Sequence, residues 1–195
     1  ENAPRGEIGI PRVLNMYENY PFWATFFKSL GFRAVLSPLS SRKIYELGMD
    51  SIPSESECYP AKLSHGHVQW LIKNGITTIF HPCIFYEKQE TPDAQNHFNC
   101  PIVVSYAENL KNNVEAVTNG DVKYIRPFIA FTDEKTVLSR LAELCGKEWD
   151  IPENEVQKAV KLAWAEQIKA KEDIRAEGKR LIENMENKGG YGIVL

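Results

Sequence analysis

Three of the four cysteines stand beside predicted breakpoints of the chain, where thiol chemistry is easiest to arrange. Cys58 lies two residues before Pro60, a residue that suits the first turn of a helix predicted over 60–73. Free N–H groups and the dipole at a helix start stabilise an anion, so Cys58 should favour the thiolate. Cys83 ends a predicted buried strand over 77–82. Two thiolates so placed can share a site at the carboxyl edge of a parallel sheet.

The third cysteine poses a geometric problem. Cys100 precedes a predicted strand over 102–105, whereas Cys83 follows the strand before it. If both strands are parallel, the two thiols lie at opposite ends of the sheet, roughly 17 Å apart for a five-residue strand. They can meet only if the loop between them folds back or the second strand runs antiparallel. Cys100 is therefore the weaker candidate ligand, and Cys145, at apolar helical spacing, is predicted to be core.

Histidines near these cysteines offer a second kind of chemistry. His65 and His67 are two residues apart on a predicted helix, so they do not share a face, which is poor geometry for a zinc pair. His81 can either join a metal site with Cys83 or act as a hydrogen-bonded structural residue, and we favour the structural interpretation. A zinc site built from Cys58, His81 and Cys83 stays open, although its spacing resembles no zinc finger.

The elements that must position these residues alternate between strands and helices, which predicts a mainly parallel sheet with helices on both faces. We predict a Rossmann-like α/β fold with four to five strands, preceded by a loose lead-in over residues 1–11. The predicted strands cover 12–16, 32–38, 77–82, 102–105 and 123–127. The predicted helices cover 22–30, 42–48, 60–73, 107–113, 132–146 and 152–187. The polar loop over 85–98 is long enough to suggest a function.

Two parts of the chain are predicted from this pattern. Residues 8–150 form the Rossmann-like domain, and residues 151–195 form a long helix followed by the beginning of a strand that leads to a further domain. The long helix carries apolar residues every three to four positions, with a face rich in Lys and Glu opposite. Glycines at 189 and 190 end it.

Composition excludes several functional classes. A net charge of −3 without a basic stripe argues against a nucleic-acid binder, and no apolar run is long enough to predict a membrane span. Four cysteines in 195 residues are too few for a disulfide scaffold and suit a reducing compartment, so we expect a cytoplasmic protein. Neither a Walker loop nor G-x-G-x-x-G occurs, so nucleotide binding has no sequence support.

Four motifs carry a resemblance to a known family. They are Tyr20–Trp23, Ser51–Lys62 around Cys58, His65–His67 and Phe80–Cys83. Together they resemble the uncharacterised middle domain of CoA-substrate-specific enzyme activases, large bacterial proteins related to the 2-hydroxyacyl-CoA dehydratases. The resemblance covers most of residues 8–111.

The resemblance implies a role in electron transfer. Such proteins combine ATP-dependent activase modules with a region like a dehydratase subunit, and dehydratase subunits hold an iron–sulfur cluster through cysteines of Rossmann-like domains. In those subunits the first two ligands lie on consecutive βα turns, matching Cys58 and Cys83, and the third comes from a later domain. The segment is thus expected to hold part of a [4Fe–4S] site, reduced by the activase modules.

Three functions follow as hypotheses. The leading one is a cluster-binding and electron-transfer module, inactive in isolation, with Cys58, Cys83 and the weaker Cys100 as ligands. Ser54, Glu55 and Ser56 would line the cluster or an acyl-CoA group, unless this loop only caps the next helix through Ser56 or Glu57. The alternative is a structural domain that docks activase modules through the long helix, with cysteines only packing. The weakest is a thiol enzyme using Cys58 with His65 or His81.

Overall fold

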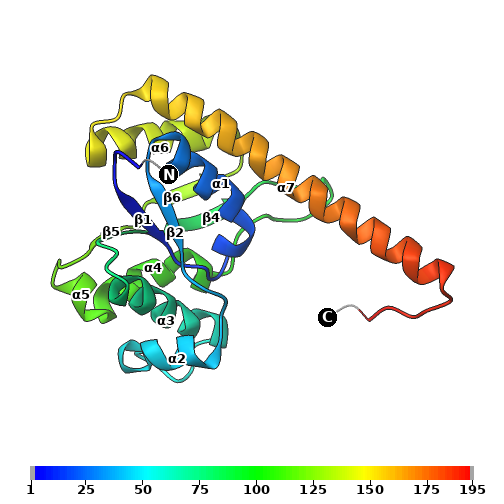
Figure 1. Ribbon diagram of the computed structural model, residues 1–195, viewed down its shortest axis with the longest axis horizontal. Coiled ribbons are helices and arrows are strands. Elements are labelled where there is room, and N and C mark those ends of the chain that lie inside the picture. Colours follow the sequence, from blue (N-terminus) through cyan, green and yellow to red (C-terminus); the bar gives the residue numbers. More distant parts are fainter. Residues whose placement is uncertain (1–2, 194–195) are drawn as a thin grey trace.

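The computed structural model describes residues 3–193 and shows a layered α/β domain from which one long helix projects (Figure 1). Its elements run β1 Glu7–Ile10, α1 Met16–Ser29, β2 Arg33–Leu36, α2 Arg42–Gly48, a 3₁₀ turn Met49–Ser51, α3 Tyr59–Lys73, β3 Thr78–Phe80, β4 Cys83–Glu87, α4 Pro101–Asn113, α5 Glu115–Thr118, β5 Lys123–Ile125, β6 Phe128–Phe131, α6 Glu134–Trp149 and α7 Glu153–Asn187.

The main sheet has four strands in the order β2-β1-β3-β5, and all of its pairings are parallel. The predicted parallel α/β fold with a long C-terminal helix is therefore confirmed. After β1 the chain adds β2 on one side of it, and then β3 and β5 on the other side. The strand order thus reverses between β1 and β3, the point at which open α/β sheets commonly bind ligands.

A second, two-stranded parallel sheet continues the first. β3 passes into β4 through Pro82, and β5 passes into β6 through Pro127, after which β4 and β6 pair with each other. The His81 N–H donates to the Ile125 carbonyl and the Cys83 N–H to the Pro127 carbonyl, each at 2.9 Å, so pairing continues across the bend. Strand β3 ends at Phe80, just before Pro82, as predicted, but a new strand begins directly at Cys83, which the sequence did not predict.

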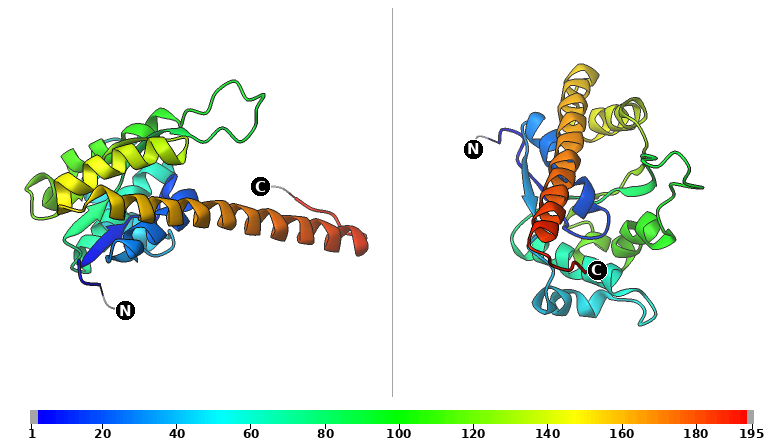
Figure 2. Two further views of the ribbon diagram at one scale, coloured as in Figure 1. Left: turned by 90° about the horizontal axis from the view of Figure 1, so that it is seen from above. Right: turned by 90° about the vertical axis from the view of Figure 1, so that its right-hand side faces the viewer.

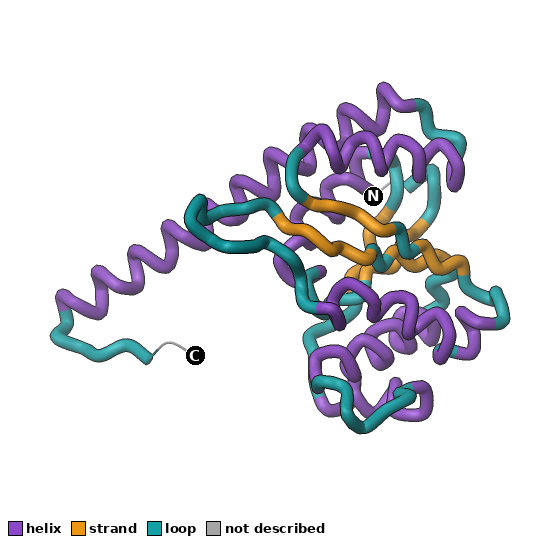
Figure 3. Tube along the Cα trace, turned by 180° about the vertical axis from the view of Figure 1, so that it is seen from behind, coloured by secondary structure: helices purple, strands orange, loops and turns teal. Residues whose placement is uncertain are grey.

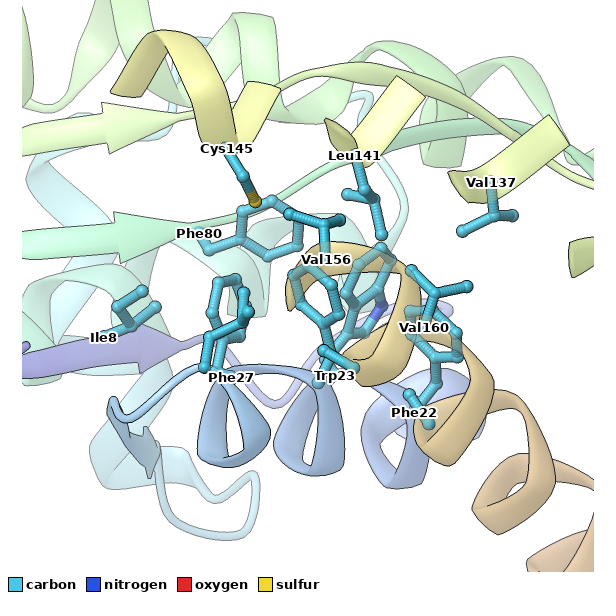
Figure 4. Close-up of a cluster of buried hydrophobic side chains, with 14 of the residues drawn as sticks. Ile8, Phe22, Trp23, Phe27, Phe80, Val137, Leu141, Cys145, Val156 and Val160 are labelled. Carbon is cyan, nitrogen blue, oxygen red and sulfur yellow. The ribbon is translucent and has the colours of Figure 1, made fainter. Parts of the chain in front are cut away.

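Helices cover both faces of the main sheet (Figures 1 and 2). On one face α1, α6 and the first half of α7 bury an aromatic cluster, in which Trp23 and Phe27 meet Phe80 at ring-centroid distances of 4.8 and 5.0 Å. Figure 4 shows Cys145 reaching this cluster from α6. Its burial raises the pKa of the thiol to about 12, which confirms it as a core residue. On the other face α3 and α4 enclose a second apolar cluster.

Helix α1 begins six residues earlier than predicted, because Pro21 does not end it. A buried glutamine of α7 compensates for the proline. The Gln167 Oε1 accepts from the Phe22 N–H at 3.1 Å, and its Nε2 donates to the Glu18 carbonyl at 2.8 Å. One side-chain amide thus satisfies both backbone groups beside the proline. The first turns of α1 therefore depend on a residue far along the chain, which local sequence patterns do not reveal.

Two predicted strands are wrong. Residues 12–16 do not form the first strand; β1 lies earlier, where Ile8 and Ile10 pair with β2. Leu14 has a φ of 52°, a left-handed conformation that a strand does not accept. Residues 102–105 form the start of α4 rather than a strand, with Pro101 in the first turn. The remaining predicted strands, over 32–38, 77–82 and 123–127, contain β2, β3 and β5.

The long helix α7 divides into a packed half and a projecting half (Figure 2). Val156, Ala159, Val160 and Ala163 are buried against α1 and α6, whereas the later turns extend beyond the domain. Residues 191–193 have no regular structure, and the rest of the predicted strand at 191–195 lies outside the described residues. None of the helices within residues 3–193 combines the length and apolar character needed to cross a membrane.

Candidate functional site

The carboxyl edge of the main sheet gathers polar residues from four strands. Arg12 follows β1, Ser37 follows β2, His81 follows β3 and Arg126 follows β5. Segments that leave the carboxyl ends of parallel strands meet at one edge, which is why residues so far apart in sequence become neighbours. Helix α3 supplies two further histidines to this region, and hydrogen bonds show how each ring is held.

His67 is held by two serines. Its Nδ1 lies 2.8 Å from the Ser37 Oγ and its Nε2 lies 3.0 Å from the Ser40 Oγ. The Arg12 backbone N–H also donates to the Ser37 Oγ at 2.7 Å, which ties the end of β1 to the end of β2. Burial, followed by the positive charge of Arg12, lowers the pKa of His67 to about 4. The ring is therefore neutral at ordinary pH and both of its nitrogens are occupied.

His65 faces a different set of partners. The Ser51 hydroxyl donates to the Gly48 carbonyl at 2.9 Å, so at 2.7 Å its oxygen accepts from the His65 Nδ1. The His65 Nε2 then accepts from the Tyr106 hydroxyl at 3.0 Å. Burial lowers the pKa of His65 to about 4, and burial followed by Glu57 raises the pKa of Tyr106. The two histidines of α3 thus have separate partners and form no metal pair.

His81 is a structural residue in this fold. It is almost fully buried, and its Nδ1 lies 2.8 Å from the Tyr124 hydroxyl. Burial, with a smaller contribution from nearby His67, lowers the pKa of His81 to about 4. The third histidine near the predicted site is therefore neutral and hydrogen-bonded, like the other two.

The cysteines fall into two kinds. Cys58 and Cys100 are exposed and stand as the N-cap residues of α3 and α4, and neither side chain makes a capping hydrogen bond. Cys83 is completely buried, and burial followed by the charge of Glu108 raises the pKa of its thiol to about 11. Glu108 forms an ion pair with Arg126 at 2.7 Å. The surface thiols are available for chemistry, whereas Cys83 is protonated.

The predicted ligands do not assemble into a complete site. Across residues 3–193, no three His, Cys, Asp or Glu side chains are grouped so that they could hold a metal ion. Cys58 is exposed whereas Cys83 is buried, so the two thiols do not share a surface. The residues present thus do not fit a whole iron–sulfur cluster. A ligand role for Cys58, Cys83 or Cys100 stays a prediction.

The polar loop before α3 makes hydrogen bonds with itself and with the first turn of α3. The Ser54 and Ser56 hydroxyls lie 2.7 Å apart, and Lys62 donates to the Glu55 carbonyl at 2.8 Å. Neither Ser56 nor Glu57 is the N-cap of α3, since Cys58 occupies that position, so the capping interpretation of this loop is wrong. The proposed binding role of Ser54, Glu55 and Ser56 stays a prediction.

A second polar cluster was not predicted from the sequence. The side-chain amides of Asn15, Asn19 and Asn99 all donate to the Oε1 of Glu87, at 3.1–3.3 Å. Burial raises the pKa of the Glu87 carboxyl. These residues come from three separate segments, and the only sequence signal was the long polar loop that begins near Glu87.

Comparison with known proteins gives one match. The model of the CoA enzyme activase uncharacterised domain (DUF2229) matches residues 7–195, almost the whole chain. Neither a curated protein nor a solved structure matches it.

Proposed function

This chain belongs to the family of the CoA enzyme activase uncharacterised domain, and we propose that it serves these enzymes as a docking module. The partner is an amphipathic helix of an activase module, and the docking surface is one face of the projecting half of α7. That face is the activase stripe, made of Ile174, Gly178, Leu181 and Met185.

The single observation that supports this proposal is that one face of α7 is buried in its first half and stays largely apolar, but exposed, in its second half. Val156, Val160 and Ala163 are buried in the domain, and steps of three and four residues lead from them through the buried Gln167 and through Ala170 to the activase stripe. Such spacing is typical of helices that pack against another helix. Yet the side chains of Ile174 and Leu181 are 73% and 55% exposed. A partner helix would bury them as α1 and α6 bury the earlier turns.

Gly178 supports a helical partner. It lies at the centre of the activase stripe, and no other group lies within 4 Å of the position that a Cβ would occupy. Glycine in a helix interior costs roughly 1 kcal/mol relative to alanine, so a reason for it is expected. Its small size lets a second helix backbone approach closely. Met185 is half-buried, and the segment after α7 returns beside it, since the Gly190 N–H donates to the Met185 carbonyl at 3.0 Å.

Charging the stripe should abolish docking. The double substitution Ile174→Glu and Leu181→Glu is expected to weaken binding of the ATPase module of the same activase at least about 100-fold. Each side chain gains about 1.5–3 kcal/mol when buried, and the introduced charge opposes burial. Isothermal titration calorimetry with the two purified modules measures the change.

Leu162→Glu provides the matched control. Leu162 lies on the same helix and is 57% exposed, but it stands twelve residues before Ile174 and is therefore about 120° away around the helix axis. Its substitution should leave the affinity within about twofold of wild type. Equal losses from both variants, or no loss from the double variant, would contradict docking through the activase stripe.

A second candidate function is favoured by the two surface cysteines. Cys58 and Cys100 are exposed N-cap residues of helices that pack on the same face of the sheet. Helix starts stabilise thiolates, and thiolates are the usual ligands of iron–sulfur clusters. In this proposal the domain offers these cysteines, with the Ser54–Ser56 turn beside Cys58, to a cluster whose other ligands come from a further domain.

Anaerobic reconstitution of the domain linked to its following domain tests this candidate. With iron and sulfide, we expect thiolate-to-iron absorption that Cys58→Ser or Cys100→Ser abolishes. Cys83→Ala separates two versions: absorption that survives it assigns the cluster to the surface thiols, and absorption that it removes makes Cys83 a ligand as the sequence suggests. Absorption that survives both surface substitutions would refute the candidate.

A further inference from the structure

A hollow of about 220 Å³ lies where the second half of α7 leaves the domain, between this helix and the segment after β4. Figure 3 shows that segment (teal) crossing beside the long helix. None of the predicted site residues and none of the cysteines contributes to it. Its walls come from the segment after β4, from Phe131 of β6 and from the face of α7 between Trp164 and Arg175.

One wall of the hollow is apolar. The rings of Phe131 and Trp164 lie 5.4 Å apart between centroids at an angle of 41°, and Ile168 continues this wall along α7. Trp164 is half-buried and Ile168 is exposed, so part of this apolar surface faces the hollow rather than the core. Flat apolar groups pack favourably on such a wall, because aromatic rings stack with offset or tilted geometry.

The same face of α7 carries two cations one helical turn apart, further along the helix than Trp164 and Ile168. The Lys171 Nζ and an Arg175 guanidinium nitrogen both contact the carboxylate of Glu90, at 2.5 and 2.8 Å. Glu90 comes from the loop between β4 and α4, so a carboxylate from outside α7 already bridges the two cations. A second hollow of about 290 Å³, which Glu18 and Ile174 also line, shares these three residues. The Glu90 ion pairs therefore lie where the two hollows adjoin.

We propose that this hollow binds a small organic carboxylate with a single flat apolar ring, and that the ligand carboxylate takes the place of Glu90 between Lys171 and Arg175. Size, wall and charge agree on this class. A cavity of about 150 Å³ accommodates benzene, so the larger hollow accepts one ring with a carboxylate attached. Arg presents a planar fork that matches a carboxylate, and Lys adds a point charge.

The exchange is energetically accessible. Both pairs of Glu90 lie at the surface, and exposed ion pairs contribute little to stability. A ligand that replaces Glu90 keeps both cations paired and adds ring contacts with Phe131 and Trp164, which Glu90 does not make. The net gain therefore comes from the apolar wall, and the charge pair selects an anion over a neutral analogue.

Benzoate and the neutral, similarly shaped benzamide are the probes that test the class of ligand. Isoleucine methyl groups labelled with ¹³C report binding by NMR, because Ile168 lines the first hollow and Ile174 the second, whereas Ile182 lines neither. We expect benzoate to shift the Ile168 methyl resonance saturably and Ile182 not at all. Benzamide should bind at least about tenfold more weakly, since it makes no ion pair.

Variants of the full chain locate the charge selection. Lys171→Met with Arg175→Met should remove the preference for benzoate over benzamide, while the charge-matched pair Lys179→Met and Arg180→Met, further along α7, should preserve it. Glu90→Gln should tighten benzoate binding about three- to tenfold, because the internal competitor is lost. Equal binding of both probes to the wild type, a preference that survives loss of Lys171 and Arg175, or no saturable shift at Ile168 would each overturn the proposal.

Discussion

Replacement of Gly66 by alanine should destabilise this domain by more than about 3 kcal/mol. The Cβ of the new side chain would lie 1.7 Å from the carbonyl oxygen of Ile44 and 2.6 Å from its carbonyl carbon. Both are backbone atoms of α2, so no side-chain rotation relieves the overlap. Helix α2 must then move away from α3. Since domains of this kind are stable by about 5–15 kcal/mol, the expected loss is a large fraction of the total.

The contact between α2 and α3 is equally close at Gly48 of α2. A Cβ on Gly48 would lie 2.2 Å from the Gly66 backbone nitrogen, so the two helices touch through a pair of glycines. Separation of α2 from α3 would also move Ser51, whose hydroxyl forms a hydrogen bond with the His65 ring. We therefore expect Gly66→Ala to disturb the polar network beside α3 as well as the helix packing.

Gly146→Ala provides the matched control for Gly66→Ala. Gly146 lies inside α6, and nothing lies within 4 Å of its Cβ position. Alanine there should stabilise the protein by about 0.5–1 kcal/mol, because glycine loses more conformational freedom in a helix. Urea denaturation gives both free energies of unfolding. A Gly66→Ala protein within about 1 kcal/mol of wild type would contradict the backbone clash.

Local signals were sufficient where an element carries its own start and stop. Helix α2 runs over Arg42–Gly48 as predicted, because Ser41 caps it and accepts from the Ile44 N–H at 3.3 Å. The parallel sheet also followed from the alternation of strands and helices. The predicted strand over 102–105 failed for the opposite reason. Its β-branched residues suggested a strand, but tertiary burial of Tyr106 and Leu110 favours a helix that begins at Pro101.

The candidate site was harder to predict because it depends on contacts distant in sequence. Pro82 was interpreted as the end of a strand, which would have placed the Cys83 thiol at an accessible edge. A second strand, β4, begins directly after Pro82, because β6 begins directly after Pro127 and pairs with it. Cys83 is consequently buried. The Glu87 cluster and the hollow beside Trp164 bring together segments more than 60 residues apart in sequence. Local sequence patterns do not predict contacts of this kind.

Acidification should unfold this protein through three histidines. His65, His67 and His81 each have a pKa lowered from 6.5 to about 4, in every case chiefly by burial. Below pH 6.5 the histidines of the unfolded chain bind protons, whereas the buried imidazoles of the native protein do not. The free energy of unfolding therefore decreases as the pH falls toward 4. Each histidine lowers the free energy of unfolding by up to about 3 kcal/mol once the pH is below 4. Between about pH 7 and pH 5 the three together lower it by about 5 kcal/mol.

One buried carboxyl acts in the opposite direction. The pKa of Glu87 is raised, so its native form retains a proton more readily than the unfolded form, and its contribution increases as the pH falls. A single group does not offset three. The net free energy of unfolding should therefore decrease steeply from about pH 6.5, well above the range in which surface carboxylates titrate.

Urea denaturation over this pH range measures the slope, which should approach three protons taken up on unfolding. His67→Gln should reduce it by about one proton when each variant is compared with its own stability near pH 7, whatever its absolute stability. Arg12→Met should reduce the slope only slightly, because Arg12 is the second cause of the His67 shift, after burial. A free energy of unfolding that stays constant from about pH 6.5 to pH 5 would mean that the three rings accept protons in the folded state. The serine and tyrosine partners that hold them neutral would then have to rearrange.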